Sequence, residues 1–147
     1  MTAPIRSSIV INRPIEDVFA VLTNVENTGK WIPANVKEWW TSDPPHGVGS
    51  TRRARIRMGW FTTENDAVAT VYEPPRRAVM KGTSSNAPFQ ASLDFEPVAA
   101  GTRVDATIEF HLSGPAKLLG GPFARWYGAR WERGMLRLKS MMEAGEL

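Results

Sequence analysis

The side chains that could handle a proton are few and stand far apart in the sequence. His46 lies in a Pro- and Gly-rich turn, residues 43–49, and His111 lies on the polar side of the last predicted strand. Tyr127 falls on the inward arc of a predicted C-terminal helix, and Asn65 on the apolar side of a predicted strand. If the protein is an enzyme, Tyr127, Asn65 and His46 are its candidate catalytic residues. The simpler alternatives are a solvated turn histidine, and polar groups that bond to backbone or water.

Other catalytic and metal-binding patterns are missing from the sequence. The chain contains no cysteine, which excludes disulfides, thiolate metal sites and a cysteine nucleophile. No cluster of His, Asp and Glu has metal-ligand spacing, and no G-x-S-x-G or phosphate-binding loop occurs. We therefore expect no metal and no cofactor, and no paired acid and base is visible.

Length and composition predict one ordinary globular domain, residues 1–147. The chain is 42% apolar and 22% charged. No apolar run is long enough to span a membrane, and the first residues lack the apolar stretch of a secretory signal. We expect a cytoplasmic protein.

The chain is mildly basic, with a net charge of +3 and a pI near 9.6. Arginines cluster in residues 52–57 and 125–137, which raises the alternative of a nucleic-acid surface. A predicted hairpin centred on residues 60–61 places Arg57 opposite Glu64 and Arg55 opposite Asp66. This pairing favours a solvated, partly neutralised face, so nucleic-acid binding is not expected.

Strand and helix patterns account for nearly the whole chain. Residues 5–12 alternate as a strand, a helix begins at Pro14, and a second short helical piece covers residues 25–30. Six further strands are predicted at residues 36–41, 51–60, 62–72, 77–83, 89–96 and 104–112. Most have one apolar and one polar face, which is typical of an antiparallel sheet with one side in water.

A long helix, residues 122–146, ends the chain. One face mixes large side chains with glycines, namely Tyr127, Trp131, Met135, Leu138 and Met142 with Gly120, Gly128, Gly134 and Gly145. Because glycine costs a helix interior about 1 kcal/mol against alanine, this face suggests a helix that shapes a space. The sequence therefore predicts an α+β fold in which a curved seven-stranded antiparallel sheet wraps this helix.

Tryptophans mark two kinds of surface. Trp31, Trp60 and Trp131 are interpreted as core or cavity-wall residues. Trp126 and Leu136 fall opposite Trp131 on the helix, and would either pack under a loop or contact another subunit. The second alternative would make the protein a homodimer.

Three segments resemble the START-like or helix-grip superfamily, also called polyketide cyclase/dehydrase-like or SRPBCC proteins. They are residues 9–19 (IVINRPIEDVF), 31–33 (WIP) and 47–51 (GVGST). The resemblance implies a cavity between the sheet and the C-terminal helix, where relatives bind lipids, plant hormones or polyketides. A minority of relatives catalyse cyclisation or dehydration.

The expected function is to bind a small hydrophobic molecule such as a lipid, polyketide or aromatic metabolite. The alternatives are a cyclase or dehydratase acting on such a ligand, and a module that binds a protein or RNA. The residues expected to contact the ligand are Trp31, Ile56, Met58, Asn65, Met80, Phe89, Leu93, Ile108, Phe110, Tyr127, Trp131, Met135 and Leu138.

Overall fold

The computed structural model describes residues 4–83, 88–111, 118 and 120–147. The elements follow the predicted order of one strand, short helices, six strands and a long helix. The strands are β1 (Ile5–Ile11), β2 (Asn35–Trp40), β3 (Thr51–Met58), β4 (Phe61–Glu73), β5 (Arg77–Gly82), β6 (Phe89–Val98) and β7 (Gly101–Phe110). The helical segments are α1 (Ile15–Thr23), the 3-10 turn η1 (Val25–Asn27), α2 (Thr28–Trp31) and α3 (Gly120–Glu143).

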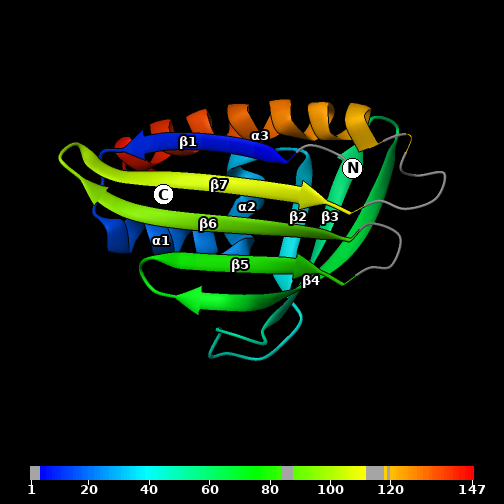
Figure 1. Cartoon of the computed structure of the whole chain (residues 1–147), viewed down its shortest axis with the longest axis horizontal. Helices are drawn as coiled ribbons and strands as arrows, with labels where there is room; N and C mark the ends of the chain where they lie inside the picture. The colour runs from blue at the N-terminus through cyan, green and yellow to red at the C-terminus, as the bar shows by residue number, and fades with distance from the viewer. Residues whose placement is uncertain (1–3, 84–87, 112–117, 119) are drawn as a thin grey trace.

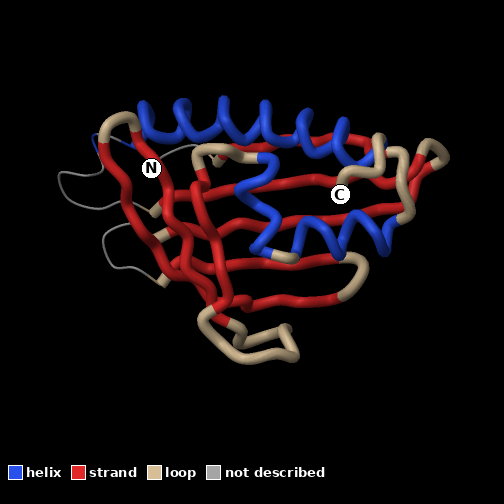
Figure 2. The backbone as a smooth tube through the Cα atoms, turned by 180° about the vertical axis from the view of Figure 1, so that it is seen from behind, coloured by secondary structure: helices blue, strands red, loops and turns tan. Residues whose placement is uncertain are grey.

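The strands form one antiparallel sheet in the order β1-β7-β6-β5-β4-β3-β2. The sheet is strongly curved, so that β2 and β3 run at a steep angle to β6 and β7 (Figure 1). Figure 2 shows α1 and α2 against the concave side, while α3 runs along the edge formed by β1. This architecture confirms the expected α+β helix-grip fold. Among the described residues, no helix has the length and apolar character to cross a membrane.

The turn between β3 and β4 differs from the prediction. It consists of Gly59 and Trp60, since Met58 pairs directly with Phe61. Gly59 has a φ of +68°, a value that a two-residue hairpin needs and that glycine adopts without a Cβ clash. Trp60 is therefore at the tip of the hairpin and exposed, so its interpretation as a core or cavity-wall residue is wrong.

The corrected turn shifts the strand register by two residues. Arg55 pairs with Glu64 and Arg53 pairs with Asp66, whereas Arg57 lies opposite a threonine. Both are ion pairs: Nη2 of Arg55 lies 2.9 Å from Oε2 of Glu64, and Nε of Arg53 lies 2.8 Å from Oδ1 of Asp66. Because side chains alternate with a period of two, the shift leaves the paired side chains of β3 and β4 on their predicted faces.

Two of the glycines that the sequence assigned to the C-terminal helix have explanations other than shaping a space. A Cβ on Gly134 would lie 2.8 Å from Cγ1 of Ile32 and 2.9 Å from the backbone oxygen of Trp31. Gly134 therefore lets α3 pack tightly on the chain that leaves α2. The helix ends at Glu143, and Gly145, with a φ of +77°, belongs to the turn that caps it. That turn is a Schellman motif, because Gly145 N–H donates to the carbonyl of residue 142 and the next N–H donates to that of 141.

The core occupies one end of the molecule. Val18, Phe19 and Leu22 of α1 pack there with the C-terminal half of α3 and with β6 and β7. Leu138 and Met142 of α3 are fully buried in this cluster. From the N-terminal half of α3, Trp131 belongs to this cluster and Tyr127 packs against it.

Candidate functional site: a cavity with a buried polar cluster

A cavity of about 390 Å³ lies between the concave face of the sheet, α2 and the N-terminal half of α3. Most of its wall is apolar or aromatic. The predicted contact residues that line it are Trp31, Ile56, Met58, Asn65, Met80, Phe89, Leu93, Ile108, Phe110, Tyr127 and Trp131. The strand residues among them come together because alternate residues of β3, β4, β5, β6 and β7 point to the concave side of the sheet. The others come from α2 and α3, which cover that side.

Three of the predicted site residues lie elsewhere. Met135 and Leu138 are not part of the lining but of the core, because the C-terminal half of α3 packs against α1 and the sheet. His46 is half-buried and stacks on Trp40, with ring centroids 3.9 Å apart. Trp40 lines the cavity, so His46 lies one side chain behind the wall.

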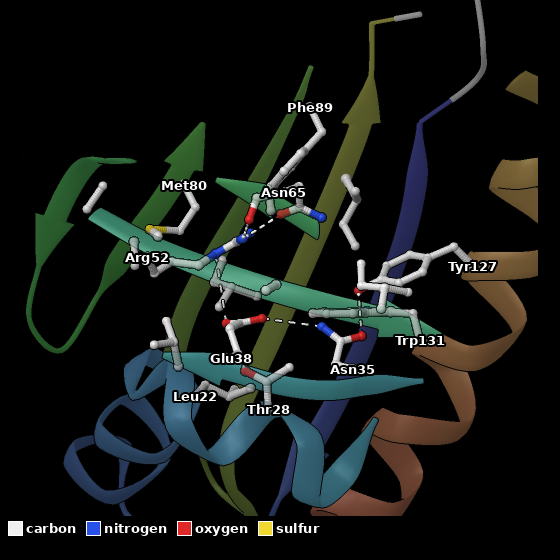
Figure 3. Close-up of a pocket in the computed structure, with 18 of the residues that line it drawn as sticks. Leu22, Thr28, Asn35, Glu38, Arg52, Asn65, Met80, Phe89, Tyr127 and Trp131 are labelled. Atoms are coloured by element: carbon white, nitrogen blue, oxygen red, sulfur yellow. Dashed lines mark hydrogen bonds and ion pairs between the residues drawn. The ribbon is translucent and has the colours of Figure 1, made fainter. Parts of the chain in front are cut away.

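A cluster of polar side chains interrupts the apolar wall. It consists of Asn35 and Glu38 on β2, Arg52 on β3, Asn65 on β4 and Tyr127 on α3, and is called the polar cluster below. Figure 3 shows these side chains linked one to the next, from Asn65 through Arg52, Glu38 and Asn35 to Tyr127. Residues far apart in the sequence thus form a single polar site.

Arg52 and Glu38 are a charge pair inside the cavity. Their side chains are only 8% exposed, and Nε of Arg52 lies 3.9 Å from Oε2 of Glu38. Nη1 of Arg52 donates to Oδ1 of Asn65 at 2.5 Å and to the Asn65 carbonyl at 3.3 Å. Nη2 makes no hydrogen bond within the described part of the chain. The guanidinium therefore keeps donor capacity for a ligand oxygen.

Hydrogen bonds hold the carboxylate end of the polar cluster. Oε1 of Glu38 accepts from Nδ2 of Asn35 at 3.3 Å, and Oε2 accepts from the Thr28 hydroxyl at 3.2 Å. The hydroxyl of Tyr127 makes a long contact of 3.5 Å with Oδ1 of Asn35. Asn35 therefore joins the carboxyl group to the phenol.

Burial changes the acidity of two groups in the cluster. Loss of water raises the pKa of Glu38 above its usual value, although Arg52 and the hydrogen bonds from Asn35 and Thr28 act in the opposite direction. Burial, and then the charge of Glu38, raises the pKa of Tyr127 to about 12. At neutral pH Tyr127 is therefore a neutral hydrogen-bond donor, and Glu38 takes up a proton more readily than an exposed glutamate.

Sequence reasoning missed Arg52, Glu38 and Asn35. For Arg52 a signal was present, because it shares the inward side of β3 with Ala54 and Ile56. In β2 the inward-facing residues do not follow the usual period of two. A bulge between Asn35 and Lys37 lets Asn35 and Glu38, three positions apart, face the same side.

The chemistry available in this cavity is that of hydrogen bonds and protons. Arg52, Asn35 and Tyr127 supply donors, and Glu38 can accept or return a proton. Within the described ranges, no three His, Cys, Asp or Glu side chains are close enough together to hold a metal ion.

The chain belongs to the polyketide cyclase / dehydrase and lipid transport family, whose model matches residues 2–143. Among curated proteins it is similar to the uncharacterized protein Rv2574 of Mycobacterium tuberculosis, with 27% identity over 122 residues, 79% of this chain and 71% of the relative. The family description supports a role in hydrophobic ligand binding or cyclisation.

Solved structures share the fold at low sequence identity. TTHA0849 from Thermus thermophilus superimposes with a TM-score of 0.82 at 15% identity, covering 99% of this chain and 100% of that one. The di-domain ARO/CYC StfQ from the steffimycin biosynthetic pathway gives 0.77 at 13% identity, covering 98% of this chain and 52% of StfQ. At such identities the likeness shows the fold alone.

Proposed function

We propose that this protein binds a small, mainly hydrophobic molecule in the cavity between the sheet and α3. The observation that carries the proposal is an apolar cavity of about 390 Å³ whose wall contains one buried polar cluster. Small-molecule sites are typically concave and apolar, with a few placed polar groups that orient the ligand. A lipid, a polyketide or an aromatic metabolite would match this kind of wall.

The cavity wall favours a ligand with an apolar body and an oxygen at one end. Aromatic rings of Phe89, Phe110 and Tyr127 offer flat surfaces on which a ring system can lie. Arg52 and Tyr127 can donate hydrogen bonds to a carbonyl or hydroxyl oxygen. Since Glu38 already lies beside Arg52, a neutral oxygen fits the site better than a carboxylate does.

Native mass spectrometry of the purified protein tests this proposal. A bound molecule would appear as added mass that is lost on denaturation, and extraction would identify its class. Ala91 lines the cavity between Met80 and Ile108, so Ala91→Phe should fill the space and remove the added mass. Ala129→Phe, on the exposed side of α3, is the matched control and should retain it.

An empty protein would be titrated with 1-anilinonaphthalene-8-sulfonate, a fluorescent probe for apolar sites. Saturable binding that Ala91→Phe removes and Ala129→Phe keeps would support a binding cavity. The proposal fails if Ala91→Phe leaves the binding of every apolar molecule unchanged, or if the protein binds none.

An enzyme of the cyclase or dehydratase type is the second candidate, and Glu38 favours it. Aldol cyclisation and loss of water both need a group that removes a proton from carbon and returns one to oxygen. A buried carboxyl with a raised pKa, connected to Tyr127 through Asn35, is suited to that task. Loss of conversion of the extracted ligand in Tyr127→Phe and Glu38→Gln, with binding retained, would favour the enzyme. Unchanged conversion in both would remove the polar cluster from any mechanism.

A further inference from the structure

Three exposed apolar side chains, Trp60, Phe61 and Leu118, form a group that is called the hydrophobic tip below. Trp60 is 93% exposed, Leu118 is 84% exposed and Phe61 is 46% exposed. The rings of Trp60 and Phe61 contact each other edge to face, with centroids 5.2 Å apart. Scattered apolar residues are ordinary on a surface, but apolar groups gathered at one place indicate an interaction site.

These side chains lie at one end of the molecule. Trp60 and Phe61 belong to the turn and first residue of the β3–β4 hairpin, and Leu118 stands two residues before α3 begins. Figures 1 and 2 both show the tip of this hairpin beside the first turn of α3. The hydrophobic tip therefore projects from the end of the molecule that contains the cavity.

The same end carries positive charge. The sequence has Arg57 but no acidic residue at positions 57–63, and Arg125 and Arg130 but no acidic residue at positions 120–131. Arg57 and Arg125 are exposed and form no ion pair with any described residue. Arg53 and Arg55 on the same outer face of β3 are both paired with carboxylates. Within the described residues of this hairpin, Arg57 is therefore the arginine near the tip, and it has no carboxylate partner.

We infer that the hydrophobic tip docks on the surface of an anionic lipid bilayer, with Trp60 among the lipid headgroups and Arg57 and Arg125 near lipid phosphates. Tryptophan prefers the bilayer interface because its ring is apolar and its N–H is polar. A basic residue near an anionic membrane contributes about 1 kcal/mol. A projecting hairpin turn offers too little area for a stable protein interface, which buries about 800 Å² per partner.

The hydrophobic tip lies next to the cavity, so docking would also affect the cavity. Phe61 belongs to the hydrophobic tip and also lines the cavity, and so it connects the two. Met58 beside it and Phe123 of α3 line the same part of the cavity. Docking would bring this part of the cavity wall to the bilayer, where a hydrophobic ligand could be exchanged. That consequence depends on the proposed function, whereas docking itself does not.

Vesicle co-sedimentation tests the inference without any ligand. The protein is mixed at low salt with vesicles of phosphatidylcholine alone, or of equal parts phosphatidylcholine and phosphatidylglycerol. Binding is expected to the anionic vesicles and is expected to weaken with salt. Trp60→Ala should lower the partition coefficient about tenfold, and Arg57→Gln and Arg125→Gln about fivefold each.

Leu136→Ala is the matched control. Leu136 is also exposed and apolar, but it lies about 24 Å along α3 from the first residue of the helix, so its replacement should leave binding unchanged. Equal binding of wild type and Trp60→Ala, or no binding to anionic vesicles at low salt, overturns the inference. A dimer that dissociates in Trp60→Ala, without vesicle binding, would identify the tip as an interface between two copies instead.

Discussion

Arg52 and Arg53 are neighbours in the sequence but have opposite surroundings. Arg52 points into the cavity and contacts Glu38 and Asn65, whereas Arg53 points outward and pairs with Asp66 in water. A buried charge depends on its partner because no water replaces it, while a surface pair is screened. Adjacent arginines of one strand should therefore respond very differently to replacement.

Replacement of Arg52 by Met should destabilise the protein by about 3–5 kcal/mol at pH 7.5, since it leaves the Glu38 carboxylate buried without its cation. Urea unfolding monitored by circular dichroism measures this change. Arg53→Met is the control and should shift the unfolding midpoint far less. The double variant Arg52→Met with Glu38→Gln should recover part of the loss. Equal effects of the two single arginine replacements would contradict the buried pair.

The raised pKa of Glu38 predicts a pH dependence of stability with a definite sign. Since the pKa is higher in the folded state, the unfolded chain loses this proton first as the pH rises above the usual value of 4.5. The stability that protonated Glu38 contributes at low pH is therefore lost as the pH rises from 4.5 through the pKa of Glu38 in the folded protein. Glu38→Gln should remove this decline when unfolding free energies of both proteins are compared across that window.

Carboxylates with a lowered pKa do not interfere with this comparison. The pKa values of Asp66 and Glu143 are held down by hydrogen bonds, from Arg53 and Lys139 respectively. Their stabilising effect is lost only as the pH falls below the usual carboxyl range. The same slope in wild type and Glu38→Gln above pH 4.5 would show that burial does not raise the pKa of Glu38.

At the level of elements, α3 combines a tightly packed segment with a cavity wall. Gly134 permits the close approach of α3 to Trp31 and Ile32, and Trp31 in turn stacks edge to face on Trp131 with centroids 5.2 Å apart. Both tryptophans line the cavity. The position of the cavity wall therefore depends on a contact that only glycine allows.

Gly134→Ala should destabilise the protein by roughly 1–3 kcal/mol, despite the higher helix propensity of alanine, because the added Cβ meets backbone and side-chain atoms. Thermal unfolding measures the effect. Gly121→Ala is the matched control, since nothing lies within 4 Å of a Cβ there, and it should be neutral or slightly stabilising. If both variants had the same melting temperature, that result would contradict the close contact of Gly134 with Trp31 and Ile32.

The molecule as a whole has a filled end and a hollow end. Val18 and Phe19 of α1 and the C-terminal half of α3 fill the first, and β2, β3, α2 and the N-terminal half of α3 enclose the second. Leu22 and Trp131 belong both to the core and to the cavity wall. Leu138 belongs to the filled end and Leu93 to the hollow end. Stability and ligand binding should therefore depend on different residues.

Leu138→Ala should cost about 2–5 kcal/mol of unfolding free energy and leave the affinity for 1-anilinonaphthalene-8-sulfonate unchanged. Leu93→Ala should cost less, because its side chain already borders empty space, but should change that affinity. Urea unfolding and fluorescence titration of the same two variants make the comparison. A change of affinity in Leu138→Ala alone would contradict the division into two ends.

The sequence alone predicted the order of elements, the antiparallel sheet and the face of most strands. These features depend on local causes: alternation with a period of two, Pro14 at a helix start and glycines in turns. Nearly half of the apolar residues of the cavity lining were predicted for the same reason, since one face of each strand must leave the water.

Only the tertiary structure decided which inward residues enclose a cavity and which fill the core. Trp131 and Leu138 share one face of α3, yet the first lines the cavity and the second is buried against α1 and the sheet. The polar cluster also required the fold, because a bulge in β2 and the pairing of β2 with β3 and β4 bring Asn35, Glu38 and Arg52 together. Such contacts join residues distant in sequence, and no local period encodes the distance between them.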